Sequence, residues 1–356
     1  MIERIFVTAL GAATAVGRTA WASAAAVRAG ISGFTEHPAW LDTAGQPLRL
    51  AMAPWLDQQL AGAERFEALL LPAIDEVLGT LHAPPSSASR WALALAQPCP
   101  RPGLPEDFGR QQLSRVSHRY ASVFGGAAAF AAGHAAGLLA LQAAWSKLRT
   151  GALDACVVAG AESWIDAQAL RWLESSDQLH GAGALNNAWG FIPGEAGAAL
   201  LLMRETVAQA QSLSPLAELL EVGTAHEPKR IKTETVCTGE GLTQAFRAAL
   251  KALPAGQQVS DIYCDMNGEP YRADEFGFTA LRTKEHFSSA GEFSAPADCW
   301  GDVGAAGSLL HLVLACAAGA KGYARGPLAL IWASAESGER AAALLTTATA
   351  MPAPGG

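Results

Sequence analysis

The sequence is poor in charged residues, which make up 16% of it, and no run of lysines or arginines occurs anywhere along the chain. The formal net charge of −8 is the opposite of what a nucleic acid or an anionic membrane surface attracts. A glycine-rich phosphate loop of the P-loop kind is also missing. We therefore expect no nucleic-acid partner, no membrane partner and no cofactor.

The six cysteines are scattered, without CxxC pairs or the Cys/His spacing of a metal centre. Cys156, Cys264 and Cys316 stand in apolar runs, where a buried free thiol is the ordinary state. The pattern predicts no metal site, and it favours a reducing, cytoplasmic location.

Segments that could target a membrane are few. Glu3 and Arg4 precede only a short apolar stretch, which we interpret as a strand and a glycine turn and not as a signal peptide. The run from Ala121 to Trp145 is long enough to cross a bilayer, and only His134 and Gln142 in it are strongly polar. Internal glycines and the lack of an aromatic belt favour a helix buried on all sides, with a membrane span as the alternative.

Half of the residues are hydrophobic, and short β runs alternate with helical stretches, which indicates an α/β protein. The strands expected are Ile5–Leu10, Arg90–Ala96, Asp154–Gly160, Ala196–Met203, Leu216–Gly223, Ile262–Met266, Leu328–Ser334 and Ala341–Thr346. The helices expected are Ala20–Gly30, Arg65–Leu81, Ala135–Arg149, Leu242–Leu253 and Ala306–Ala318. Segments 83–89 and 97–108 are predicted loops and the last residues a frayed tail. A similar order of elements recurs after Glu205–Pro215, which predicts two halves, 1–205 and 206–356.

Several stretches, in order along the chain, resemble the β-ketoacyl synthase family. They are FVTALGAATAVG, RAGISGF, GHAAGLLALQAAWSKLRTGALDACVVAGAES, WGFIPGEAGAALLLMRE, DMNGEP and WGDVGAAGSLLHLVLA. The resemblance implies a thiolase-like five-layer α/β/α/β/α fold of two similar halves. It also implies a homodimer or a heterodimer with a second chain.

The catalytic residues of that family are replaced at each position that the resemblance identifies. Condensation needs a thiolate at a helix N-terminus and two neutral imidazoles. By the resemblance, His134 stands at the cysteine position, while Asn267 and Gly301 stand at the two histidine positions. Pro296 takes the place of a lysine, and SAESGER lacks the phenylalanine-and-glycine loop that gates the acyl pocket. These replacements argue against condensation.

His134 allows two interpretations. A buried helix N-terminus should lower its pKa, which would leave a neutral imidazole able to act as a base. Alternatively, the ring fills the vacated cavity and forms local hydrogen bonds. A base needs an oriented partner, and a His134–Asn267–Glu269 cluster is the arrangement that the sequence offers.

The segment ADCWGDVG offers a weak alternative nucleophile, Cys299, but a carboxylate beside a thiol raises its pKa. Trp300 is expected to fill the vacated space. The polar stretch from Asn267 to Glu275 is either a solvated loop with a helix start or a recognition surface. The candidates for such an interaction are Glu269, Tyr271, Arg272, Trp300 and Asp302. Trp164, Trp172 and Trp189 are candidates for contacts between subunits.

Two classes of function follow. RAGISGFTEHPAWLDTAGQPLRLA and YCDMNGEPYRADEFGF resemble short synthase-like chains found beside bacterial type VI secretion effectors. That resemblance implies a non-condensing adaptor or chaperone with an effector or spike protein as partner. The alternative is an acyltransferase or acyl-binding partner subunit acting on acyl carrier protein or acyl-CoA. An acidic carrier would need a basic patch, for which the candidates are Arg65, Lys147, Arg149, Lys229, Arg230 and Lys232.

Overall fold

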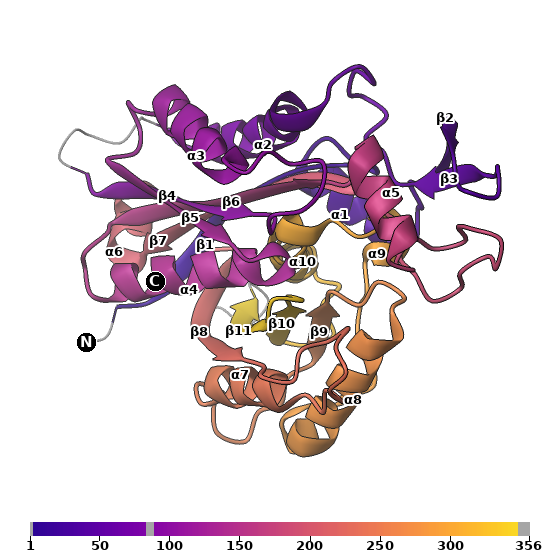
Figure 1. Cartoon of the computed structure of the whole chain (residues 1–356). Helices are drawn as coiled ribbons and strands as arrows, with labels where there is room; N and C mark the ends of the chain where they lie inside the picture. The colour runs from indigo at the N-terminus through magenta and orange to yellow at the C-terminus, as the bar shows by residue number, and fades with distance from the viewer. Residues whose placement is uncertain (1–2, 83–88, 348–356) are drawn as a thin grey trace.

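Strands and helices alternate along the chain in the computed structural model, which describes residues 3–82 and 89–347 (Figure 1). The strands are β1 (Ile5–Thr14), β2 (Thr35–Leu41), β3 (Pro47–Leu50), β4 (Trp91–Gln97), β5 (Gly126–Ala131), β6 (Ala155–Ser163), β7 (Glu195–Arg204), β8 (Ala217–His226), β9 (Asp261–Cys264), β10 (Leu328–Ser334) and β11 (Glu339–Thr347). The helices are α1 (Ala20–Arg28), α2 (Gly62–Leu78), α3 (Phe108–Arg119), α4 (Ala136–Arg149), α5 (Ala167–Ser175), α6 (Glu205–Ala210), α7 (Glu240–Leu250), α8 (Pro270–Thr283), α9 (Ala297–Trp300) and α10 (Gly304–Ala320). Short 3-10 turns lie at Gly133–Ala135 and Lys284–His286.

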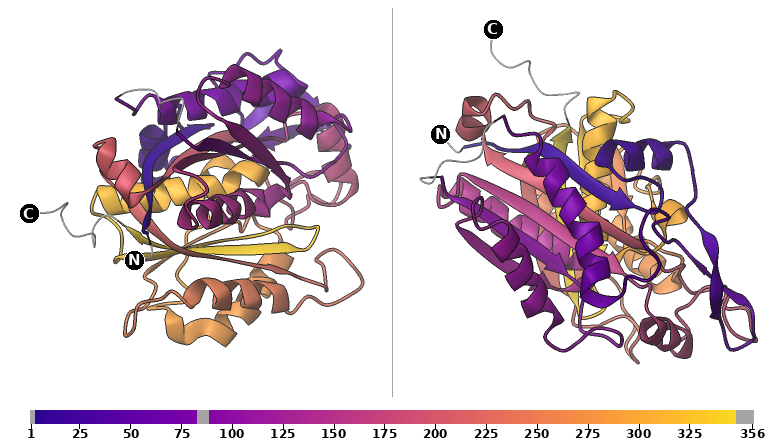
Figure 2. Two further views of the ribbon diagram at one scale, coloured as in Figure 1. Left: turned by 90° about the vertical axis from the view of Figure 1, so that its left-hand side faces the viewer. Right: turned by 90° about the horizontal axis from the view of Figure 1, so that it is seen from above.

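Nine strands follow one hydrogen-bonded order, β5-β4-β6-β7-β1-β8-β11-β10-β9, and β2 pairs with β3 in a separate hairpin. The order divides in the middle, because β1 and β8 pair only through Phe6 with Glu218 and Val7 with Ala217. Five strands therefore form one part of the sheet and four strands the other, and Figure 2 shows the two parts stacked.

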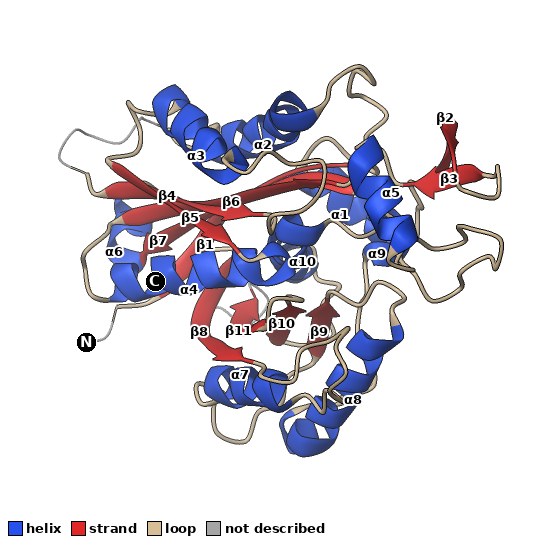
Figure 3. Ribbon diagram, viewed as in Figure 1, coloured by secondary structure: helices blue, strands red, loops and turns tan. Residues whose placement is uncertain are grey.

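Helices lie on both outer sides of these two parts and between them (Figure 3). α2 and α3 cover the five strands, α7 and α8 cover the four strands, and α4 and α10 lie in between. The side chains of α10 are buried from Gly304 to Gly319, as expected of a helix that is apolar on all sides. Separate apolar clusters fill the three interfaces, and the central one is the largest of them. The predicted five-layer α/β/α/β/α fold is confirmed.

The two parts of the sheet repeat one pattern. In the first, the order β4-β6-β7-β1 has a parallel pair followed by two antiparallel pairs. In the second, β9-β10-β11-β8 has the same sequence of pairings. The two halves are thus similar, as predicted, in the order and direction of their paired strands. The predicted division at 205/206 falls between β7, which ends at Arg204, and β8, which begins at Ala217.

The two outer edges of the sheet differ. β5 has no counterpart in the second half, and its outer side pairs with no strand among the described residues. The short edge strand β9 is covered, because Ser294 exchanges backbone hydrogen bonds with Ile262 and Cys264. One edge is therefore open and the other is closed.

The structure corrects the interpretation of the run from Ala121 to Trp145 as one buried helix. The run contains the strand β5, a turn at Gly133 and the helix α4. Gly133 has a φ of +51°, a conformation that breaks a continuous helix and favours glycine. The helices in the described part of the chain are all too short or too polar to cross a membrane. Residues 83–88 of one predicted loop, and the predicted frayed tail, lie outside the described residues.

Candidate functional site

The two central helices meet at their N-termini. His134 lies in the turn that leads into α4, and Asp302 lies just before α10. His134 Nε2 is 2.7 Å from Asp302 Oδ2, with side chains that are 12% and 2% exposed. The positive ends of two helices thus converge on one buried carboxylate, which is a favourable arrangement for a negative charge.

Asp302 has a full set of hydrogen-bond donors. Oδ1 accepts from Trp164 Nε1 at 3.2 Å and from the backbone N–H of Gly304 at 2.9 Å. Oδ2 accepts from Asn267 Nδ2 at 2.7 Å, in addition to its contact with His134. Burial raises the pKa of Asp302. The positive charges of His134 and of a nearby arginine, together with the hydrogen bonds, lower it by more, so the net pKa of Asp302 lies far below the usual range.

That arginine is Arg272 of α8, and it is completely buried. Its Nη1 donates to Asp265 Oδ2 at 2.8 Å and to the Ser334 carbonyl at 3.0 Å. Its Nη2 lies 3.4 Å from both ring nitrogens of His134. Burial lowers the pKa of Arg272, but Tyr271 and the surrounding carboxylates raise it well above the ordinary value.

His134 is therefore part of an ion pair. Burial and Arg272 lower its pKa, but Asp302 raises it, and the net pKa of His134 is raised above the ordinary value. The expectation of a lowered pKa and a neutral ring is wrong, because the carboxylate beside the ring outweighs both burial and the helix N-terminus. A ring that is protonated in this pair has no free lone pair and cannot act as a base.

A second set of contacts closes the network towards the surface. Glu269 accepts from Tyr271 Oη at 2.7 Å and from Asn267 Nδ2 at 3.1 Å. Lys232 Nζ lies 2.9 Å from Glu269 and 2.6 Å from Glu336, and so joins the loop before α7 to the β10–β11 turn. Lys232 has a φ of +59°, which is uncommon for a residue with a side chain. Burial raises the pKa of Glu269, while Arg272 and Lys232 lower it to a net value below normal.

The charges of this network nearly balance. Three cationic side chains, His134, Arg272 and Lys232, face the buried carboxylates Asp265, Glu269 and Asp302 and the partly exposed carboxylate Glu336. A buried network is stable only when its charges are paired and hydrogen-bonded; each charged group here has at least one such contact, although Asp265 Oδ1 and Arg272 Nε are buried without a hydrogen bond. The arrangement is suited to holding α4, α8 and α10 together, and it leaves no thiolate and no neutral imidazole at its centre.

Comparison with known proteins places this geometry in context. The model of the family described as "Beta-ketoacyl synthase, N-terminal domain" matches residues 114–208, and no curated protein matches the sequence. A chain of the AntDE:AntF complex, a type II PKS acyl-carrier protein bound to its ketosynthase, superposes with a TM-score of 0.78 at 15% identity, covering 98% of this chain and 100% of that one. The fold is that of the ketosynthases.

Two further solved structures agree with this. The ishigamide ketosynthase/chain length factor gives a TM-score of 0.76 at 16% identity, covering 98% of this chain and 100% of that one. The module 6 ketosynthase of the bacillaene synthase from Bacillus subtilis 168 gives 0.76 at 12% identity, covering 97% and 72%. At these identities, the likeness to ketosynthases establishes the fold alone.

Within the ketosynthase fold, Gly301 occupies a position that excludes a side chain. It has φ +72° and ψ −170°, and a Cβ there would lie 2.6 Å from the Ile192 carbonyl oxygen. A histidine could not occupy this place without a shift of the backbone. The nearby Cys299 is buried, and burial followed by the charge of Asp298 raises its pKa, which weakens it as a nucleophile.

The structure brings together His134, Asn267 and Glu269, but through Asp302 and not directly. Asn267 bonds to both carboxylates, and no hydrogen bond joins Asn267 or Glu269 to His134 among the described residues. Sequence reasoning missed Asp302 as the partner of His134, and it missed Arg272 as part of the site. The signal for Asp302 was an acidic residue just before a long apolar helix, a common capping position.

Most of the candidates for an interaction surface are internal. Glu269, Arg272, Trp300 and Asp302 are buried, and only Tyr271 is half-buried. A partner that binds this conformation must therefore touch other residues. Trp300 belongs to the central apolar cluster, in keeping with its expected role of filling space. Of the three tryptophans considered for subunit contacts, Trp164 is buried, Trp172 is half-buried and Trp189 is 69% exposed.

Proposed function

We propose that this ketosynthase-like chain does not condense acyl groups and acts as a protein-binding adaptor or chaperone. The observation that carries the proposal is the ion pair of His134 with Asp302 at the N-terminus of α4. Acyl transfer through a thioester needs a sulfur nucleophile, and a protonated imidazole offers neither sulfur nor a lone pair. Asn267 cannot move a proton as an imidazole does, and Gly301 has no side chain.

Two exposed regions support a role in protein binding. The residues 28–51 include the β2–β3 hairpin, which projects from the body of the molecule (Figure 1). The residues 263–278 lead into α8, where apolar side chains line a hollow of about 580 Å³. Both segments are those that resemble chains associated with type VI secretion. We therefore propose an effector or spike protein of that system as the partner.

The hollow beside α8 is the surface that we propose for the partner. Leu281 is 70% exposed, Phe278 is 39% exposed and Phe293 is 38% exposed. Large apolar side chains gathered in this way on a surface mark interaction sites more often than single exposed residues do. The partner would place an apolar segment in this hollow.

The open edge of β5 supports a dimer. Gly126 to Ala129 are exposed, and the strand carries neither a charge nor a proline to discourage pairing. A second copy of the chain could add its own β5 at this edge, which would continue the sheet across a twofold axis. A different ketosynthase-like chain would form a heterodimer in the same way.

The alternative, an acyl-binding partner subunit, rests on the likeness to a ketosynthase bound to its acyl-carrier protein and to a ketosynthase/chain length factor. An acidic carrier would need exposed cations. Lys147 and Arg149 are exposed at the end of α4, but Arg65 is not available, because it is buried in an ion pair with Glu195 at 2.6 Å. The basic patch considered from the sequence is thus smaller than expected.

The test combines two measurements. Intact-mass analysis follows incubation of the protein with malonyl-CoA, acyl-CoA and loaded acyl carrier protein. Tagged protein is then recovered from the source organism, in parallel with Leu281→Asp, which places a charge in the α8 hollow, and Asp298→Asn, a control at an exposed position. We expect no gain in mass, and recovery of a secretion effector or spike protein by the wild type and the control but not by Leu281→Asp.

Other outcomes decide against the proposal. A stable acyl adduct that disappears with His134→Gln or Cys299→Ser would restore an enzyme. Selective recovery of an acyl carrier protein would favour the partner-subunit alternative. A secretion protein that binds Leu281→Asp as well as the wild type would remove the α8 hollow as the docking surface.

A further inference from the structure

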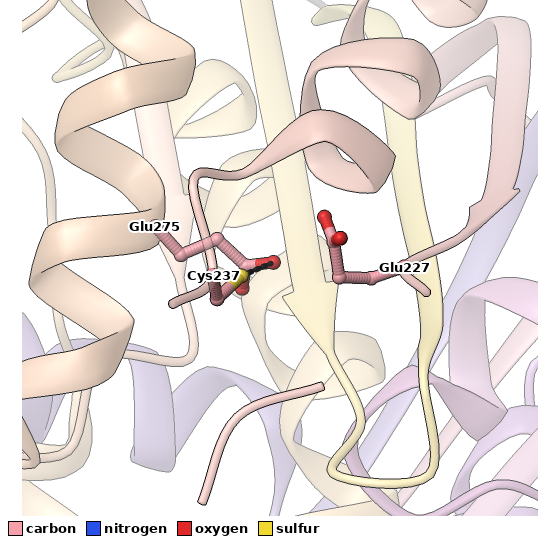
Figure 4. Close-up of side chains that lie close together, drawn as sticks. All are labelled: Glu227, Cys237 and Glu275. Atoms are coloured by element: carbon pink, nitrogen blue, oxygen red, sulfur yellow. Dashed lines mark hydrogen bonds between the residues drawn. The ribbon is translucent and has the colours of Figure 1, made fainter. Parts of the chain in front are cut away.

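Three side chains that can bind a metal, Glu227, Cys237 and Glu275, lie close together in the second half of the chain (Figure 4). Glu227 follows β8 directly, Cys237 lies in the loop before α7, and Glu275 lies in α8. One ligand atom from each of the three lies within 4.8 Å of the others. They come from three separate elements, so their meeting is a property of the fold.

Glu275 gives an independent indication of a ligand. The residue is completely buried, and its Oε1 accepts from Arg340 Nε at 2.5 Å. Its Oε2 is buried with no hydrogen-bond partner among the described residues, and the same holds for Nη2 of Arg340. A buried carboxylate oxygen without a partner is costly, and buried polar atoms in proteins are nearly always satisfied by hydrogen bonds, water or ions. Cys237 Sγ, 3.6 Å from Glu275 Oε1, provides only a weak contact.

The side-chain charges at this place do not sum to zero, although the backbone N–H groups of Lys229 and Gly241 donate to the two oxygens of Glu227 at 3.1 and 2.7 Å. Glu227, Glu275 and Arg340 are all fully buried, which leaves one negative charge in excess. The cations on the adjoining elements are partly exposed and already bonded: Lys229 to Glu240, and Arg282 to the Thr238 carbonyl. A divalent cation together with a Cys237 thiolate would bring the sum of the buried charges to zero.

We propose that Glu227, Cys237 and Glu275 form a Zn²⁺ site, with water in a fourth position. A thiolate ligand selects zinc over magnesium and calcium, which prefer oxygen ligands alone. Zinc bonds of roughly 2.0–2.3 Å place tetrahedral ligands roughly 3.3–3.8 Å apart, so the three side chains need to approach only by small rotations. On binding, the Cys237 thiol gives its proton to solvent and its sulfur forms the Zn–S bond, with no change of oxidation state.

The site would act as a clip on the loop from Glu227 to Gly239. This loop carries Lys232, which bridges Glu269 and Glu336 over the ion-paired network. Zinc bound at both ends of the loop would hold that bridge in place. The inference stands on these contacts alone and does not depend on the adaptor function.

The test uses the full-length protein, freed of metal with a chelator and then titrated with Zn²⁺ against a chromophoric competitor, and with Co²⁺ in a parallel sample. Cys237→Ser removes the sulfur ligand, and Cys99→Ser removes another half-buried thiol as a matched control. We expect one Zn²⁺ per chain and a sulfur-to-cobalt charge-transfer band in the wild type and in Cys99→Ser. We expect Cys237→Ser to lose the band and to bind Zn²⁺ at least about 100-fold more weakly, because loss of an outer-shell partner alone costs 10–100-fold.

Two results would overturn the inference. One is the absence of a sulfur-to-cobalt band in the wild-type protein. This result does not depend on the folding of any variant. The other is a Cys237→Ser protein with a native circular dichroism spectrum that binds Zn²⁺ as tightly as the wild type.

Discussion

Replacing Asp302 with asparagine keeps the volume of the side chain but removes the charge that pairs with His134. The carboxylate is 2% exposed, so solvent cannot compensate for its loss. Removing one partner of a buried ion pair typically costs about 3–5 kcal/mol. The cost should be near this range at pH 5, where His134 would be left charged beside Arg272. It should shrink as the pH rises through the folded pKa of His134, because a neutral ring at 134 no longer needs the carboxylate.

The measurement is equilibrium unfolding in urea, monitored by tryptophan fluorescence. Asp298→Asn, at an exposed position, is the control and should change the free energy of unfolding by less than about 0.5 kcal/mol. The double variant His134→Gln/Asp302→Asn removes one positive and one negative charge together, so the net charge of the network is the same as in the wild type with a protonated His134. The two substitutions should therefore couple by about 1–3 kcal/mol, so that Asp302→Asn costs less in the His134→Gln background. Costs that simply add would refute the ion pair as the centre of the network.

Three further predictions concern other parts of the molecule. Since the folded pKa of His134 is raised, the stability that it contributes is complete below the unfolded value of about 6.5 and is lost as the pH rises through the folded pKa. The stability difference between wild type and His134→Gln should therefore fall as the pH is raised above about 6.5 in urea titrations, and a constant difference would contradict the pairing. Gly301→Ala should cost at least about 2 kcal/mol, because Cβ meets a backbone carbonyl at a positive φ, and a neutral effect in thermal unfolding would contradict that contact. Ala128→Lys should convert the proposed dimer to a monomer in light scattering, since a charge on β5 opposes strand pairing, while Lys147→Ala should leave the dimer intact. A wild-type protein that is monomeric in this measurement would refute the proposed dimer.

The sequence predicts eight of the eleven described strands, because each combines β-branched or apolar residues with clear turns at its ends, but it does not predict the β2–β3 hairpin. It fails for the run around β5, where alanine, glycine and phenylalanine carry no period that distinguishes a strand from a buried helix. The break between β5 and α4 depends on the backbone of Gly133, whose φ of +51° is not visible in composition. The helices α3 and α8 were also missed as full elements, because their polar residues read as loops.

The candidate site, too, could be predicted from the sequence only in part. The resemblance places His134 and Asn267 at the positions that meet in space, since it aligns whole segments of chain. It does not reveal that Asp302 pairs with His134, because the partner comes from a segment 168 residues away and its identity is set by packing. The pKa of His134 could not be predicted for the same reason: the helix N-terminus and burial are local, whereas the carboxylate that outweighs them is not. Arg272 was assigned to a surface because its neighbours in sequence are polar.

The unequal edges of the sheet limit how large an assembly of this chain can grow. Ser294 already occupies the hydrogen-bonding groups of β9, so a strand from another molecule has nowhere to add at that end. In the nine-strand sheet of the described residues, β5 is the edge left to accept such a strand, and two copies that paired there through a twofold axis, as we propose, would use up both of these edges. Strand addition to this sheet would then stop at two molecules. In the proposed dimer, the extra strand of the first half would join two copies and leave no edge of the nine-strand sheet for a fibre.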